Sequence, residues 1–247
     1  MKGKDLRARR ADSSAPRASL LASGIAGDVY RALRGDILSG RLAPGLRLRF
    51  ETLTRERHAS VGTIREALMA LLSDGLVRSD AGRGFWVSPV SLQDARDIER
   101  LRLNLELAAL TDSIRHGGES WEIELLSAYH RVSKIEERDR LDLLDDEWDA
   151  RHRSFHFALL AGCTSPWTLH FCHVLFDQAF RYRQLAMPLD ATPRFKLQEH
   201  RQMMEAALAR DVEEAANVMA AHIRSTLMTL LARAPTIFGE DDGRPAQ

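Results

Sequence analysis

Two histidines stand one helical turn apart in the segment Arg-His-Arg-Ser-Phe-His-Phe. They are His152 and His156, and a spacing of four residues puts both imidazole rings on the same face of a helix. Such a pair can supply half of a metal site, or it can be two ordinary histidines on a helix surface. The pair alone does not decide between these interpretations, so the elements around it have to be considered.

A second set of possible metal ligands follows the pair. His170 and His173 flank Cys172 at helical spacing, and imidazole and thiolate groups both bind zinc. This set is an alternative location for a metal ion.

The distribution of charge separates an N-terminal part from a C-terminal part. The chain has 247 residues, of which 45% are hydrophobic and 28% are charged, as in a globular protein with a core. Residues 1–90 hold 16 lysines and arginines against 9 acidic residues, and residues 91–247 hold 19 against 26. A basic first part joined to an acidic remainder indicates that the first part meets a polyanion.

Neither a membrane span nor a signal peptide is predicted. No apolar run approaches the roughly 18 residues of a transmembrane helix, and no apolar stretch of signal-peptide type follows the basic N-terminus. The two cysteines, Cys163 and Cys172, need not pair, which fits a reducing compartment. We therefore expect a cytoplasmic protein with no membrane partner.

The N-terminal part is expected to be a disordered basic arm, 1–22, followed by one domain, 23–90. Helical periodicity and capping residues predict helices at 25–40, 50–59 and 60–77, with the third ending at Asp74-Gly75. A short extended piece is expected between the first two helices. A strand, a glycine-rich tip and a second strand follow the third helix. The order helix, helix, helix, hairpin is typical of a winged helix-turn-helix with a small β-hairpin wing.

The remainder is predicted to be an all-α bundle over residues 91–235, followed by a disordered tail, 236–247. Serine, threonine and aspartate residues at helix starts, two of them followed by proline, mark the helix boundaries. We expect about six helices, near 92–116, 120–137, 140–161, 166–187, 193–209 and 212–233. The expected fold class is mainly α.

The segment SVGTIREALMALLSDGLVRSDAGRGFWV resembles the DNA-binding half of the GntR family of bacterial transcriptional regulators. Its motifs are Arg65-Glu66-Ala67-Leu68, then Gly75-Leu76-Val77, then Gly82-Arg83-Gly84-Phe85. The resemblance covers about residues 25–90 and implies a winged helix-turn-helix that binds an operator in double-stranded DNA.

Seven residues are candidates for contact with DNA. Ser60, Gly62 and Thr63 begin the expected recognition helix, which enters the major groove, and Arg65 can reach a phosphate or a guanine. Gly82 and Gly84 let the wing approach the minor groove, with Arg83 available to enter it. The alternatives are a solvated helix arginine at 65 and an ordinary glycine turn in the wing. Many relatives have arginine where this chain has Val61, so their operator sequence does not transfer.

The helical half resembles the FCD ligand-sensing domain of the FadR branch of that family. Arg102 and Glu106 match its Arg-X-X-Leu-Glu arrangement, and RSFHFALL matches its Phe-His-X-X-Leu element. The resemblance implies a metal site in which the ligands are, by position, His152, His156, His200 and His222. The family usually has aspartate where this chain has His152. An all-histidine set suits a divalent transition metal, zinc or nickel.

The resemblance implies a metabolite-responsive transcriptional regulator that binds a pseudo-palindromic operator as a homodimer, and most such relatives are repressors. The effector is expected to be a small carboxylate that completes the metal coordination, with Arg102 as a second anchor. The alternative for Arg102 is that it only pairs with a neighbouring residue. Glu106 is expected to orient Arg102, and Asp149 to support His152. Two alternatives remain. One is a metal-free regulator with a larger or apolar effector, and the other is a metal-dependent hydrolase, which the absence of His-Glu-X-X-His opposes.

Overall fold

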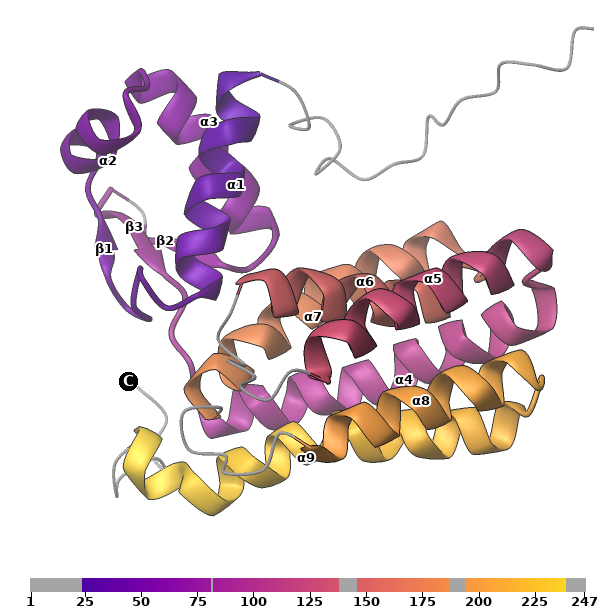
Figure 1. Ribbon diagram of the computed structural model, residues 1–247. Helices are drawn as coiled ribbons and strands as arrows, with labels where there is room; N and C mark the ends of the chain where they lie inside the picture. The colour runs from indigo at the N-terminus through magenta and orange to yellow at the C-terminus, as the bar shows by residue number, and fades with distance from the viewer. Residues whose placement is uncertain (1–23, 81, 138–145, 187–193, 239–247) are drawn as a thin grey trace, which may run out of the picture.

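The computed structural model describes residues 24–80, 82–137, 146–186 and 194–238. Within these residues the chain forms an N-terminal head and a C-terminal helical bundle, and the head lies beside one end of the bundle (Figure 1). The predicted fold class, mainly α with a winged helix-turn-helix and an all-α bundle, is confirmed. The predicted basic arm lies outside the described residues.

The head packs three helices against a small antiparallel sheet. Its elements in chain order are α1 (Ile25–Leu38), β1 (Arg47–Leu48), α2 (Phe50–Arg57), α3 (Val61–Ser73), β2 (Val77–Asp80) and β3 (Gly84–Val87). Strand β3 lies between the other two, with Arg47 opposite Trp86 and Ser79 opposite Phe85. The extended piece predicted between the first two helices is therefore strand β1, which extends the predicted hairpin to three strands.

Helix α3 has clear local reasons for its start and its stop. The Oγ atom of Ser60 accepts a hydrogen bond from the Thr63 amide at 3.2 Å, which caps the first turn. The helix ends at Ser73, and Gly75 follows with a φ of +72°, a conformation that glycine adopts without strain. Its buried face holds four core side chains, Ile64, Ala67, Leu68 and Leu71.

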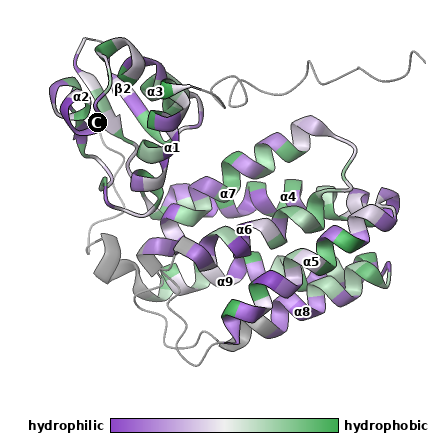
Figure 2. Ribbon diagram, turned by 45° about the horizontal axis from the view of Figure 1, so that its top comes forward, coloured by the Kyte–Doolittle hydropathy of each residue, from purple (hydrophilic) through white to green (hydrophobic). Residues whose placement is uncertain are grey.

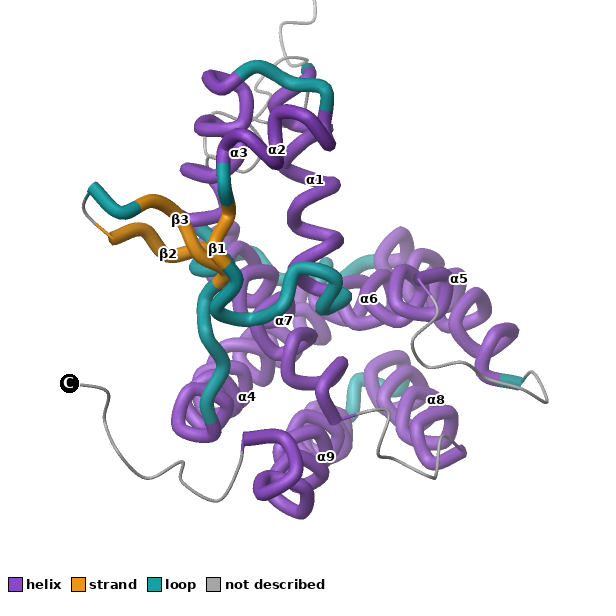
Figure 3. Tube along the Cα trace, turned by 90° about the vertical axis from the view of Figure 1, so that its left-hand side faces the viewer, coloured by secondary structure: helices purple, strands orange, loops and turns teal. Residues whose placement is uncertain are grey.

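The bundle consists of six helices in the described part of the chain. They are α4 (Leu92–His116), α5 (Glu119–Glu136), α6 (Asp146–Leu160), α7 (Pro166–Ala186), α8 (Arg194–Leu208) and α9 (Val212–Phe238). Helix α4 contacts α6, α7 and α9, and α5 contacts α6 and α8. Seen along the bundle, the helices enclose a common interior (Figure 3).

The helix boundaries agree with the sequence except at the end of α9. This helix runs to Phe238, so the predicted end at 233 and the predicted tail start at 236 are wrong by a few residues. No glycine or proline signal stops the helix before Pro235, and a helix can continue through a proline at the cost of one hydrogen bond. The predicted start of a helix at 140 lies outside the described residues.

Separate apolar cores stabilise the head and the bundle. The head core gathers side chains from α1, α3 and the sheet, and the bundle core gathers side chains from α4, α5, α6, α7, α8 and α9. Hydrophobic and hydrophilic residues alternate around the bundle helices (Figure 2), as expected for helices with one buried face. Each part can therefore hold functional side chains on a scaffold of its own.

Among the described residues, no helix is both long enough and apolar enough to cross a membrane.

Candidate functional site

The four histidines predicted as metal ligands meet inside the bundle. His152 and His156 come from α6, His200 from α8 and His222 from α9. All four are buried, with exposed fractions of 7% or less. Each ring contributes one nitrogen, either Nδ1 or Nε2, to a group of four atoms that all lie within 4.8 Å of one another. The alternative that His152 and His156 lie on a helix surface is therefore wrong.

Two of the rings are held by carboxylates. Nδ1 of His200 lies 3.0 Å from a carboxylate oxygen of Glu136, at the end of α5. Nδ1 of His222 lies 2.6 Å from Oε2 of Glu199, on α8. A carboxylate accepts a hydrogen bond from Nδ1–H and leaves Nε2 with its lone pair, which is the arrangement that prepares histidine for a metal.

The donor set fits a transition metal. Nε2 of His200, the nitrogen that keeps its lone pair, is buried and has no hydrogen-bond partner among the described residues, a cost that native structures rarely leave uncompensated. Burial, together with the neighbouring histidines, lowers the pKa of His152 and of His156 well below the usual range. Those two rings are therefore neutral at pH 7, which is the form that binds metals.

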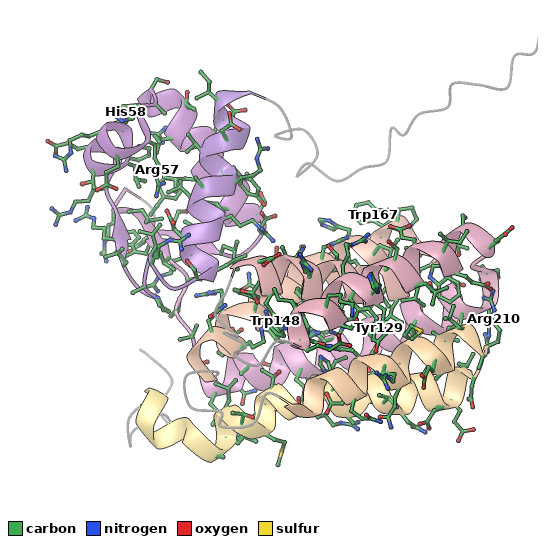
Figure 4. The ribbon with its side chains drawn as sticks, in the orientation of Figure 1. Arg57, His58, Tyr129, Trp148, Trp167 and Arg210 are labelled. Carbon is green, nitrogen blue, oxygen red and sulfur yellow. The ribbon has the colours of Figure 1, made fainter. Side chains whose placement is uncertain are left out.

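His152 has different surroundings. Its ring stacks on Trp148, with centroids 4.5 Å apart, and its Nδ1 lies 2.8 Å from Nη1 of Arg183 on α7. Asp149 pairs with the same guanidinium. The predicted support of His152 by Asp149 stays a prediction, and sequence reasoning missed Arg183, which contacts both residues. Trp148 lies within the bundle (Figure 4).

A small polar cavity of about 20 Å³ adjoins the histidines. Its walls include Arg102, His152, Phe176, Phe180, Arg183 and His222. Arg102 is buried and pairs with Glu106 through Nε at 2.6 Å and Nη2 at 3.2 Å, so the expectation that Glu106 orients Arg102 is confirmed. Arg102 also borders a second cavity of about 20 Å³, which is mostly apolar. A volume of this size holds about one water molecule or an ion.

The predicted DNA-contacting residues of α3 lie at or near its free end. Ser60, Gly62 and Arg65 are exposed, and Thr63 is half-buried because it completes the cap. The guanidinium of Arg65 lies 5.0 Å from the ring centroid of Phe50, which holds the side chain against the head while leaving its donors in solvent.

The wing tip has the backbone that its glycines predict. Gly82 and Gly84 have φ values of +74° and +120°, which residues with a Cβ atom rarely adopt. Arg83 between them is exposed, and its carbonyl accepts a hydrogen bond from Arg47 at 2.9 Å. The head also exposes arginines that sequence reasoning did not single out, namely Arg47, Arg49, Arg55 and Arg78. Their only signal in the sequence is the positive charge of the first part of the chain.

The alternative metal set does not form among the described residues. Cys172 is buried and its sulfur is a free thiol, whereas His173 is exposed and stacks on Phe157 with centroids 3.7 Å apart. His170 packs against Trp167. The group of candidate metal ligands within the described ranges is the four-histidine cluster alone.

Helix α7 connects the cavity to the head. Asp177 accepts a hydrogen bond from Nε of Arg34 in α1 at 3.1 Å and also pairs with Arg153 of α6. Gln178 donates to the carbonyl of Asp74 at 2.7 Å. Phe180 lines the histidine cavity and also packs against the head core.

Comparison with known proteins identifies both parts of the chain. Residues 25–87 match the family of bacterial regulatory proteins called gntR, and residues 97–225 match the FCD domain. The HTH-type transcriptional regulator BphR of Paraburkholderia xenovorans (strain LB400) is 40% identical over 200 residues, which cover 80% of this chain and 82% of that protein. The HTH-type transcriptional repressor GlaR of Escherichia coli (strain K12) is 36% identical over 200 residues, covering 79% and 91%.

Solved structures share the fold. Escherichia coli McbR/YncC superposes with a TM-score of 0.73 at 20% identity and covers 86% of this chain and 99% of its own. A GntR transcriptional regulator from Rhodococcus sp. RHA1 gives 0.65 at 22% identity, covering 84% and 97%. With the motif residues placed as described, the chain belongs to the GntR family, in the FCD-containing architecture of the FadR subfamily, and is a DNA-binding transcriptional regulator rather than an enzyme.

Proposed function

We propose that this regulator is a repressor that binds a pseudo-palindromic operator. Its affinity for the operator is controlled by a small carboxylate that binds beside a metal ion in the bundle. Repression is the activity named for the relative GlaR, of which this chain covers 91%. A homodimer would present two heads to the two halves of the operator, since a two-fold protein reads a two-fold site. Such a protein acts in the cytoplasm, where the chromosome is.

The proposed metal is a divalent transition ion, zinc or nickel, held by imidazoles of the four-histidine cluster. The buried Nε2 of His200, which has no partner among the described residues, and the carboxylates on His200 and His222 support this assignment. When bound, the ion supplies a positive charge that attracts an anionic ligand. Arg102 borders the same cavity, and its fork of N–H donors suits a carboxylate.

The observation that carries the proposal is the double role of α7. One face of this helix, with Phe176, Phe180 and Arg183, borders the histidine cavity. The adjoining face, with Asp177 and Gln178, holds the head by hydrogen bonds. A ligand that displaces one face therefore disturbs the other.

The size of the cavity makes this displacement necessary. A space of about 20 Å³ admits an ion but not an organic acid. An effector has to move side chains of α7 or of its neighbours, and it can shift the regulator between two states by as much as its affinities for them differ.

The test begins by selecting operator sequences from a pool of random DNA duplexes with the full chain. We expect an inverted repeat to be enriched. Its affinity is then measured by fluorescence anisotropy with and without zinc, across a panel of small mono- and dicarboxylic acids. At least one acid should weaken binding about tenfold, roughly 1.4 kcal/mol, in the metal-loaded protein.

Two results would contradict the proposal. Failure to enrich any sequence would remove the operator function. An acid that acts equally on wild type and on the His200→Ala variant would remove the metal from the mechanism and favour the metal-free alternative.

A further inference from the structure

The histidines of the cluster differ in the group that contacts their Nδ1 atom. For His200 and His222 the partner of Nδ1 is a carboxylate, Glu136 or Glu199. A carboxylate only accepts hydrogen bonds, so Nδ1 carries the proton and Nε2 keeps its lone pair. Both rings are therefore set as ligands through Nε2.

His152 has the opposite arrangement. Its Nδ1 lies 2.8 Å from Nη1 of Arg183, and a guanidinium has donors only and keeps its charge in proteins. Nδ1 of His152 must then accept, and the proton of the neutral ring sits on Nε2. That nitrogen lies 3.1 Å from Nε2 of His156. His152 thus points an N–H into the cluster, while the lone pair of His156 faces it.

The position of Arg183 is fixed from several sides. Its guanidinium pairs with Asp149 and lies 4.9 Å from the ring centroid of Trp148 and 4.5 Å from that of Phe180. Moving it would separate a buried charge from its carboxylate and both aromatic faces, which is costly. The proton on Nε2 of His152 is therefore built into the packing.

The cavity beside these groups has a surplus of donors. Nε of Arg183 is buried and has no hydrogen-bond partner in the described part of the chain. Arg102, His152 and Arg183 all border the same space. Donor groups gathered around a cavity next to a cation need an acceptor, and a carboxylate oxygen is one.

We infer that His156, His200 and His222 are the metal ligands, and that His152 together with Arg183 forms the anion-binding edge of the site. This inference rests on the proposed metal centre and divides its residues between two tasks. It departs from the expectation that His152 takes the place of the usual aspartate ligand. The ligand class is a small carboxylate, which accepts from His152 and from Arg183.

The first test titrates the full chain with Co²⁺ against a chromophoric chelator. His152→Ala and His156→Ala are a matched pair, because both remove a buried imidazole from α6 one turn apart. We expect His152→Ala to keep one Co²⁺ per chain with affinity within about threefold of wild type, and His156→Ala to lose about 100-fold or more. A loss of about tenfold or more in His152→Ala would overturn the assignment. Thermal unfolding of both variants checks that they are folded.

A second measurement counts imidazoles by X-ray absorption of the Co²⁺-loaded protein. We expect three in wild type and four in Arg183→Met, because removing the guanidinium lets the His152 proton move to Nδ1 and frees Nε2. Four imidazoles in wild type would overturn the inference.

Acetate serves as the probe for the anion-binding edge. Its affinity for the Co²⁺-loaded protein should fall about tenfold or more in His152→Ala, and unchanged affinity, or no binding to wild type, would overturn the anion role. Failure of the proposed metal function has a different signature, because wild type would then bind no Co²⁺ at all.

Discussion

At the scale of single residues, the side chain proposed to read DNA from α3 is exposed to solvent. Arg65 is exposed on α3 and rests on the ring of Phe50. That contact limits the conformations of the side chain without using its N–H donors, so less freedom is lost on binding.

We predict that Arg65→Gln weakens binding to the selected operator by about 1–3 kcal/mol. The loss should be measured by fluorescence anisotropy at one fixed salt concentration. Arg115→Gln is the control, because Arg115 is also an exposed helix arginine but belongs to the bundle. Equal affinities of Arg65→Gln and Arg115→Gln would place the DNA interface elsewhere on the head.

The carboxylates behind the histidines act through the rings that they hold. Glu136→Gln keeps the size of the side chain but removes the negative charge from the group that accepts the hydrogen bond of His200 Nδ1–H. We predict a loss of about 10–100-fold in zinc affinity, measured by chelator competition. Glu137→Gln, one residue later and exposed, should bind zinc like wild type. Similar values for the two variants would show that Glu136 does not support the site.

At the scale of elements, α7 borders the histidine cavity and also contacts the head. Asp177 is one of its polar contacts to the head, and it pairs with both Arg34 of α1 and Arg153 of α6. Arg153 follows His152 directly on α6, so α6 also reaches both the histidine cluster and the interface with the head.

We predict that Asp177→Asn leaves metal content unchanged but reduces the effect of the acid on operator affinity. The reduction should be about 0.5–2 kcal/mol, a typical change for a residue that carries coupling. The measurement is the operator affinity with and without the acid in each protein. Asp97→Asn, which breaks an exposed ion pair with Arg100, is the control. A full effector response in Asp177→Asn would exclude this contact from the coupling.

At the scale of the whole molecule, the sequence predicted the secondary structure of both parts of the chain better than the contacts inside the histidine cluster. Capping residues such as Ser60 and helix stops such as Gly75 are local, so the sequence predicted the head and the order of the bundle helices well. The contacts that distinguish His152 from the other histidines are not local, because Arg183 lies 31 residues away. Only the packing of α6 against α7 brings that pair together.

The proposed binding of two chains to one operator can be tested directly. Sedimentation of the full chain on its selected operator should give two chains per duplex, because one head covers one half of an inverted repeat. Removing one half of the inverted repeat should weaken binding strongly. The centres of the two half-sites should lie about one helical turn of DNA apart, or a multiple of one turn. One chain bound per full operator would contradict the two-fold account.

The most direct test of the central claim is the metal content of the untagged protein, purified without chelators and measured by elemental analysis. The account predicts about one transition metal ion per chain in wild type, and almost none in His200→Ala. Arg201→Ala, an exposed neighbour of His200, should retain the metal. Wild-type protein that holds no metal, and takes up neither zinc nor nickel when they are added, would contradict the account of the bundle as a metal-assisted sensor.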